Sequence, residues 1–313
     1  MPTTAVLLLQ MGGPDSLEAV RPFLKNLFRD REIIRLGPAV LQPLIAALIV
    51  ARRTPAVIEK YREIGGASPL RRITEQQAAA LEQQLTIPCA VGMRYWHPFT
   101  ADTLQSLQAR GISRLVVLPL YPQYSRATSG SSINDLKRLV AKQAAPMKLT
   151  ILEQFHDHPG YISAIADRIR QACSKLEQPE QATILFSAHS LPQSFIDNGD
   201  PYLEQVMKTV EMVMAQIPSI PHHIGFQSKA GPVAWLEPST EHQLKTLGEA
   251  GCTNLVVVPI SFVSDHIETL HEIDIEYREL AHLSGIRSFV RTESLNDHPD
   301  FIACLADLVQ SVL

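Results

Sequence analysis

The stretch Ile184-Leu185-Phe186-Ser187-Ala188-His189-Ser190-Leu191-Pro192 indicates an α/β fold with a site at the end of a strand. Its first residues form an apolar run, which is typical of a buried strand. Small polar residues, one histidine and a proline follow. In open parallel sheets, ligands bind just beyond the carboxyl ends of the strands, where His189 stands. A neutral imidazole there can bind a metal or accept a proton near neutral pH. On this stretch alone, a histidine that only satisfies a loop is an equal alternative.

Strand-like and helical segments alternate along the rest of the chain. Apolar runs at 5–9, 89–93 and 115–120 each end in a loop that leads into a helical pattern. Strands that alternate with helices favour parallel pairing and therefore an α/β fold.

The second half of the chain repeats the first at an offset of 140 residues, as between Gly111 and Gly251. Pro119 likewise matches Pro259, and an Asp-His-Pro triplet occurs at 157–159 and again at 297–299. Self-similarity of this length indicates a duplication. We therefore predict two Rossmann-like, doubly wound parallel-sheet halves, with the active-site cleft between them. The halves are expected at 1–150 and 151–313, and whether the C-terminal helix packs back on the first half is left open.

The duplication also sorts the histidines. His158 and His298 occupy matching positions just before a predicted helix, which is typical of a helix-entry residue. His189 and His266 have no counterpart in the first half. We therefore place the reactive groups in the second half and expect hydroxyl, aromatic and arginine contacts from the first.

An acidic stripe follows the last long apolar run of the second half. Glu268, Glu272 and Glu276 recur at every fourth position, so they share one face of a predicted helix. Like charges at this spacing repel, which leaves two interpretations: a solvated acidic face, or a face along which cations pass. The stripe begins at the same predicted sheet edge as His189. Imidazole and carboxylate without thiolate suit Fe, Zn or Co.

The totals exclude several classes of protein. Lys and Arg number 28 against 32 Asp and Glu, for a formal net charge of −4, so no basic excess predicts a nucleic-acid partner. The four cysteines form no C-x-x-C pair, so neither a structural zinc site nor a cysteine-held cluster is indicated. Scattered cysteines in a chain of 313 residues are typical of the reducing cytoplasm. The most apolar segment, 36–50, is interrupted by prolines and is too short to span a bilayer.

These motifs resemble those of the ferrochelatases, the terminal enzymes of haem synthesis, nearly from end to end. The matching stretches include Met11-Gly12-Gly13-Pro14, Tyr61-Arg62-Glu63-Ile64-Gly65-Gly66, Arg94-Tyr95-Trp96-His97-Pro98, Tyr121-Pro122-Gln123-Tyr124-Ser125, Phe186-Ser187-Ala188-His189-Ser190 and Ser264-Asp265-His266-Ile267-Glu268. The resemblance implies insertion of Fe²⁺ into protoporphyrin IX to form protohaem, with release of two protons, as the last step of haem biosynthesis.

The resemblance also implies roles for individual residues. His189 and Glu268 would be catalytic residues and metal ligands, and Asp265, Glu272 and Glu276 would form a secondary path for metal or protons. Porphyrin contacts would come from seven residues of the first half: Met11, Arg53, Tyr61, Ser68, Arg94, Tyr95 and Tyr121. Ligation and proton abstraction need the same lone pairs, so the division of labour between His189 and Glu268 is left open.

Residues 36–50 resemble the apolar lip of this family. Next to Arg52 and Arg53, they suit contact with a membrane surface, and an ordinary buried helix is the alternative. The protein is then expected to be cytoplasmic, with a peripheral position at the inner face of the cytoplasmic membrane left open. Both a monomer and a homodimer fit the sequence.

Two departures from relatives concern cofactors and anchors. Vertebrate members carry a [2Fe-2S] cluster on cysteines near the position of Ser125 and in a C-terminal tail, and plant and cyanobacterial members often add a membrane segment. Here Arg126 follows Ser125, and the sequence ends at Leu313. We therefore predict no tightly bound cofactor and no [2Fe-2S] cluster, with Fe²⁺ as a substrate.

Other functions remain as alternatives. The protein could be a coproporphyrin or cobalt-type chelatase, or a binding protein that carries metal or tetrapyrrole without chemistry. Some bacterial relatives that use coproporphyrin III lack the sequences found here at Met11-Gly12-Gly13 and at 265–270, so the resemblance favours protoporphyrin IX. The metal preference among Fe²⁺, Co²⁺ and Zn²⁺ stays open because all three accept imidazole and carboxylate ligands.

Overall fold

Strands with apolar residues on both faces form the centre of each half of the protein, as expected for parallel strands covered by helices on both sides. The structure, a computed structural model, describes residues 3–34, 37–217 and 219–313. The chain divides into two units, of which the first comprises 1–155 and 296–313 and the second comprises 156–295.

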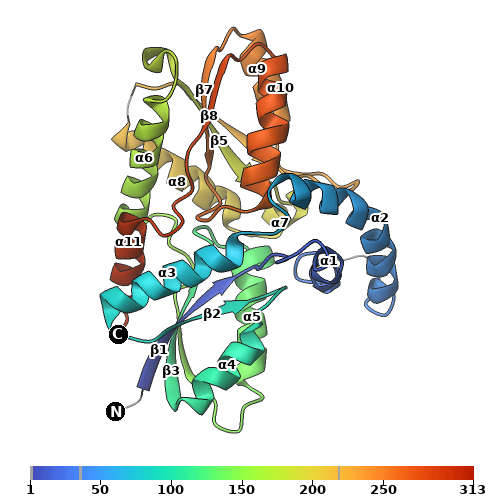
Figure 1. The fold of residues 1–313 in the computed structure, drawn as a ribbon, viewed down its shortest axis with the longest axis vertical. Helices are drawn as coiled ribbons and strands as arrows, with labels where there is room; N and C mark the ends of the chain where they lie inside the picture. The colour runs from blue at the N-terminus through green and yellow to red at the C-terminus, as the bar shows by residue number, and fades with distance from the viewer. Residues whose placement is uncertain (1–2, 35–36, 218) are drawn as a thin grey trace. The chain divides into compact units, whose positions relative to one another are not determined.

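The first unit is built on a four-stranded parallel sheet with the strand order β2-β1-β3-β4. Its elements are β1 (Thr3–Gln10), α1 (Val20–Arg29), α2 (Gln42–Glu63), α3 (Leu70–Leu85), β2 (Cys89–Met93), α4 (Thr100–Ala109), β3 (Ile112–Pro119), the π-helix η1 (Arg126–Gly130), α5 (Ser131–Val140), β4 (Lys148–Ile151) and α11 (Pro299–Gln310). Figure 1 shows α3 on one face of this sheet and α4 and α5 on the other. Leu7 and Val117 of the sheet pack with Leu104 of α4 and Leu136 of α5 in one buried cluster.

The second unit has the corresponding sheet, with all strands parallel in the order β6-β5-β7-β8. Its elements are α6 (Pro159–Cys173), the 3₁₀ turn η2 (Pro179–Gln181), β5 (Thr183–His189), α7 (Gln193–Asp197), α8 (Tyr202–Gln216), β6 (His222–Gln227), α9 (Thr240–Glu249), β7 (Asn254–Pro259), the π-helix η3 (Glu268–Tyr277), α10 (Arg278–Leu283) and β8 (Ser288–Arg291). Figure 1 shows α9 and α10 on one face of this sheet and α6 and α8 on the other. The predicted α/β fold with two Rossmann-like parallel-sheet halves is confirmed.

The two halves share details beyond strand order. The side chains of His158 and His298 both cap helices, because each accepts a hydrogen bond from a backbone N–H, that of Gly160 and that of Asp300 respectively. Their interpretation as helix-entry residues is confirmed.

The unit boundary does not follow the midpoint of the chain. Helix α6 follows β4 of the first unit but packs on α8, β7 and β8 of the second. Helix α11 follows β8 of the second unit but packs on α3 of the first, where Gln77 Nε2 donates to the Asn296 carbonyl at 2.7 Å. The helix that follows the last strand of each sheet thus packs in the other unit. The division of function between the halves 1–150 and 151–313, and the cleft between them, stay predictions.

Candidate active site

In the second unit, the loops after β5 and β7 lead to opposite sides of the sheet order, which defines a topological switch point between these two strands. From β5 the chain crosses to β6 on one side, and from β6 it crosses back to β7 on the other, so β5 and β7 flank the topological switch point. Ligands of open parallel sheets bind at the carboxyl ends of strands at such a point. His189 ends β5, and the loop that follows β7 leads to Glu268 at the start of η3.

The structure brings His189 and Glu268 into direct contact. His189 Nδ1 lies 2.9 Å from Glu268 Oε2, within hydrogen-bonding distance. Their side chains keep 32% and 22% of their surface exposed, so a metal ion can reach the pair from solvent. An imidazole and a carboxylate at this separation can share one divalent cation.

The contact shifts the pKa values of both side chains. Burial opposes the charged imidazolium of His189, but the charge and hydrogen bond of Glu268, with the charge of Glu272, raise its pKa above the ordinary value of 6.5. Burial also opposes ionisation of Glu268, but the charge and hydrogen bond of His189 outweigh it and lower the pKa of this carboxyl to about 2. The contact therefore favours the charged form of each side chain, the imidazolium of His189 and the carboxylate of Glu268.

The main chain of His189 is held independently of its ring. Its N–H donates to Ser261 Oγ at 3.2 Å, and its carbonyl accepts from the Tyr202 hydroxyl at 2.8 Å. The two hydroxyl groups are themselves 2.6 Å apart. We did not assign Tyr202 or Ser261 from the sequence, because neither belongs to the acidic stripe or to a histidine motif.

Glu272 lies beside Glu268 through a shared hydroxyl group. Ser228 Oγ contacts both carboxylates, and the Ser228 N–H donates to Glu272 Oε1 at 2.9 Å. The Tyr277 hydroxyl donates to the same oxygen at 2.9 Å. Burial and the charge of Glu268 raise the pKa of Glu272 despite these hydrogen bonds. Ser228 directly follows β6, so the rule that placed His189 at a strand end could also have found it.

The acidic stripe runs along a π-helix rather than an α-helix. In a π-helix, residues five apart face one another, as in the contact of Glu272 with Tyr277. Glu276 accordingly lies 3.7 Å from His271 Nδ1, with 42% of its side chain exposed. The structure thus brings Glu268 and Glu272 together and turns Glu276 toward His271, because the widened turn changes the period that the sequence suggested.

Asp265 and His266 flank the pair from the loop before η3. His266 is buried against the Phe262 ring, with 4.3 Å between centroids, and burial lowers its pKa. Asp265 accepts hydrogen bonds from Thr269 and from Arg291. His266 Nδ1 lies 3.1 Å from the Ser264 carbonyl oxygen, and Thr269 and Arg291 hold the Asp265 carboxylate, so we assign both residues to the surroundings of the His189–Glu268 pair.

In the first unit, β1 and β3 flank the equivalent switch point, and Met11 directly follows β1. A Cβ on Gly13 would collide with Ser68 Oγ, so glycine is required for this approach. The same absent Cβ would lie 3.9 Å from the Tyr61 hydroxyl, and the Ser68 N–H donates to the Pro14 carbonyl at 2.7 Å. The loop after β1, Tyr61 and Ser68 therefore form one cluster. Arg53 lies on the exposed surface of α2 over the Phe28 ring, 5.6 Å from its centroid.

Arg94 and Tyr95 enter a buried polar network centred on Asp30. Asp30 Oδ2 accepts from Arg94 Nη2 at 2.8 Å, from the Tyr95 hydroxyl at 2.6 Å and from Ser131 Oγ. The network joins the end of α1, the loop after β2 and the start of α5. Burial raises the pKa of Tyr95 and also that of Tyr121, which lies two residues after the end of β3. Sequence analysis missed Asp30, which belongs to none of the quoted motifs.

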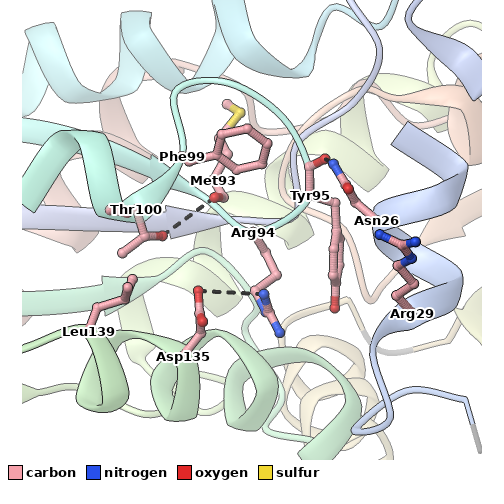
Figure 2. Close-up of a pocket in the computed structure, with 10 residues that line it drawn as sticks. Asn26, Arg29, Met93, Arg94, Tyr95, Phe99, Thr100, Asp135 and Leu139 are labelled. Carbon is pink, nitrogen blue, oxygen red and sulfur yellow. Dashed lines mark hydrogen bonds and ion pairs between the residues drawn. The ribbon is translucent and has the colours of Figure 1, made fainter. Parts of the chain in front are cut away.

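A pocket of about 330 Å³ opens at the carboxyl end of β2, the edge strand of the first sheet (Figure 2). Arg94 and Tyr95 line it together with Asp135 of α5, and Arg94 Nη1 lies 3.5 Å from Asp135. The charge of Arg94 is thus balanced by Asp30 and Asp135 inside the protein. Met11, Tyr61 and Tyr121 do not line this pocket.

Within the described residues, no three His, Cys, Asp or Glu side chains converge in an arrangement that could hold a metal ion. The metal-binding potential of the second unit therefore rests on the two-residue pair.

Comparison with known structures places the fold among chelatases. SirB from Bacillus subtilis with Fe³⁺ has a TM-score of 0.62 at 10% identity, over 99% of this chain and 95% of that one. The sirohydrochlorin chelatase SirB from Bacillus subtilis subspecies spizizenii, in complex with cobalt, has a TM-score of 0.57 at 12% identity, over 99% and 94%. At these identities the likeness concerns the fold alone.

Sequence comparison then identifies the family. The ferrochelatase family model matches residues 3–313. The ferrochelatase of Geobacter metallireducens is 56% identical over 98% of both chains, and that of Synechococcus elongatus is 49% identical over 100% of this chain and 83% of its own. The chain belongs to the ferrochelatase family. The predicted class, an enzyme that inserts a metal into a porphyrin, is confirmed.

Proposed function

We propose that His189 and Glu268 bind Fe²⁺ and deliver it to protoporphyrin IX, in the reaction porphyrin plus Fe²⁺ gives haem plus two protons. The observation that carries this assignment is the 2.9 Å contact between the two side chains at the switch point of the second sheet. Two protein ligands leave the other positions on the metal to water and then to pyrrole nitrogens. Partial coordination of this kind suits a metal that must leave the protein with its product.

The two carboxylates suit different tasks. Glu268, with its lowered pKa, stays ionised and suits ligation of the metal. Glu272, with its raised pKa, suits acceptance of a proton that leaves the porphyrin. Pairs of titratable groups whose surroundings separate their pKa values commonly divide acid–base work in this way. Ser228, which contacts both, keeps them adjacent.

The first unit is proposed to hold the porphyrin. Met11, Tyr61 and Ser68 would contact the macrocycle or its propionates around the loop after β1, and Tyr121 would do so after β3. The exposed guanidinium of Arg53 suits a propionate carboxylate, since arginine binds carboxylates with two parallel hydrogen bonds. Arg94 and Tyr95 have their polar ends engaged by Asp30, so they are proposed to shape the wall of the site.

The test is an anaerobic insertion assay with purified protein, protoporphyrin IX and Fe²⁺, Zn²⁺ or Co²⁺ in parallel. Conversion of the free-base absorption spectrum to that of the metalloporphyrin is expected. Tight porphyrin binding without this conversion would contradict the proposal and favour a carrier protein. The absence of a resident cofactor, the cytoplasmic location and the choice between monomer and homodimer stay predictions.

The acid limb of the pH profile should report His189. An imidazolium cannot bind a metal, so raising the pKa of His189 moves the loss of activity to higher pH. The value of kcat/KM for Zn²⁺ is therefore expected to fall as pH decreases through a value above 6.5. NMR titration of the His189 ring should give the same pKa, and this pKa should decrease in Glu268→Gln, which lacks the negative partner. An unchanged pKa in that variant would show that the carboxylate does not tune the ring.

The segment before and within the first turns of α2 is proposed to touch a membrane. Val40, Leu41, Leu44 and Leu48 are exposed by 88%, 49%, 63% and 67%. Leu36, the first residue of the predicted lip, lies outside the described residues. No helix in the described ranges is both long and apolar enough to cross a bilayer.

The double variant Leu44→Glu/Leu48→Glu should weaken binding to phosphatidylglycerol vesicles by about tenfold or more, because it places two charges where apolar side chains would be buried. Vesicle co-sedimentation measures the effect. Leu283→Glu is the matched control, since Leu283 is 80% exposed but lies on α10 of the second unit. Equal losses in the two variants, or none in the double variant, would argue against a membrane lip.

A further inference from the structure

One arginine of the second unit contacts acidic residues on both sides of the metal-binding carboxylates. Arg291 is the last residue of β8, the strand next to β7, and only 10% of its side chain is exposed. Its Nη1 donates to Asp265 Oδ1 at 3.1 Å, and its Nε and Nη2 donate to Asp274 Oδ2 at 2.9 Å and 2.8 Å.

The two carboxylates bracket the functional part of η3. Asp265 precedes the π-helix, and Asp274 lies within it, so Glu268 and Glu272 fall between the two residues that Arg291 binds. Each carboxylate has a second partner. Ser294 Oγ donates to Asp265 Oδ1 at 2.8 Å, and Arg278 Nη2 donates to Asp274 Oδ1 at 3.3 Å.

A π-helix needs such external support more than an α-helix does. π-Helical turns are rare and occur mostly as short stretches at functional sites. Here the π register decides which side chains meet, since the Tyr277 hydroxyl reaches Glu272 across five positions. If the segment relaxed to an α-helical register, the positions of Glu268 and Glu272 relative to His189 would change.

We infer that Arg291 is a positioning residue that holds η3 in the register that sets Glu268 against His189. The inference rests on the proposed function of that pair. The planar guanidinium suits this task because it contacts two carboxylates at once in fixed directions, which a lysine ammonium cannot reproduce. Asp265, placed on the metal or proton path by the sequence resemblance, is then an anchor of the π-helix. Arg291 and Arg278 balance the charges of Asp265 and Asp274, so the anchor adds no net charge beside the site.

The test compares Arg291→Met and Arg291→Lys with the wild type in the zinc insertion assay. Loss of the guanidinium is expected to lower kcat roughly 10- to 100-fold, as for small misplacements of catalytic groups, with KM for the porphyrin unchanged. Arg291→Lys should recover only part of kcat. Arg168→Met is the matched control, because Arg168 is a largely buried arginine of the same unit, paired with Glu293 at 3.2 Å. It should keep the wild-type kcat.

A double-mutant cycle separates positioning from general stabilisation. If Arg291 acts through Glu268, the Arg291→Met substitution should cost almost nothing further in a Glu268→Gln background. Additive losses, or a wild-type kcat in folded Arg291→Met, would overturn the inference. If Arg291→Met does not fold, Asp274→Asn and Arg291→Lys take its place in the cycle. Failure of the wild-type protein to insert metal would instead overturn the proposed function.

Discussion

Replacing His189 with alanine is expected to lower the turnover of Fe²⁺ insertion by about 10²- to 10⁴-fold, the usual effect of removing a positioned acid–base group. The variant loses the imidazole that contacts Glu268 at 2.9 Å, and with it one of the two proposed metal ligands. It should still fold, because Ser261 and Tyr202 hold the main chain of residue 189 rather than its ring. The insertion assay measures turnover, and circular dichroism with thermal unfolding checks the fold.

His242→Ala is the control for this variant, because His242 is an exposed histidine on α9 of the same unit. It should insert metal at the wild-type rate. If His189→Ala kept wild-type turnover in a folded protein, the role assigned to His189 would be wrong, whatever the motif similarity.

Glu268→Gln should have the second large effect, again a loss of about 10²- to 10⁴-fold in turnover. Glutamine has nearly the same shape but no charge, so it weakens metal binding and withdraws the negative partner of His189. We expect KM for the metal to rise as kcat decreases. Glu272→Gln should lower kcat while leaving KM for the metal near the wild-type value, because this residue is proposed to accept a proton rather than to bind the metal.

Glu279→Gln provides the reference for these substitutions. Glu279 is exposed on α10, directly after the π-helix, and should be neutral. The assignment of roles would be reversed if Glu272→Gln raised KM for the metal and Glu268→Gln did not.

Much of the arrangement could be predicted from local patterns. Apolar runs that alternate with helical segments predicted parallel sheets, and the offset between the halves predicted two of them. The contact of His189 with Glu268 could be expected because His189 ends one strand and the loop after another strand leads to Glu268, and the carboxyl ends of parallel strands meet at one edge of the sheet. The strand-like segments and their parallel pairing therefore indicated the site without any knowledge of side-chain positions.

The π-helix could not be predicted in the same way. Glu268, Glu272 and Glu276 have a spacing that suits an α-helix, and no local signal distinguishes the wider turn. Its proposed support is Arg291, which is 17 residues from Asp274 in sequence and reaches it from β8, the strand paired with β7. The Asp30 network likewise joins distant parts of the sequence, because Asp30 follows α1, Arg94 follows β2 and Ser131 begins α5. Contacts of this kind depend on tertiary structure.

The place of α11 in the first unit sets an order of events during synthesis on the ribosome. The second unit, 156–295, is an insertion within the first, so all its residues emerge before α11 does. A nascent chain can therefore assemble the unit that carries His189 and Glu268 while α3 still lacks its partner helix. A chain truncated before Asn296 would have the same incomplete state, with the His189–Glu268 pair present in the second unit and one covering helix missing from the first.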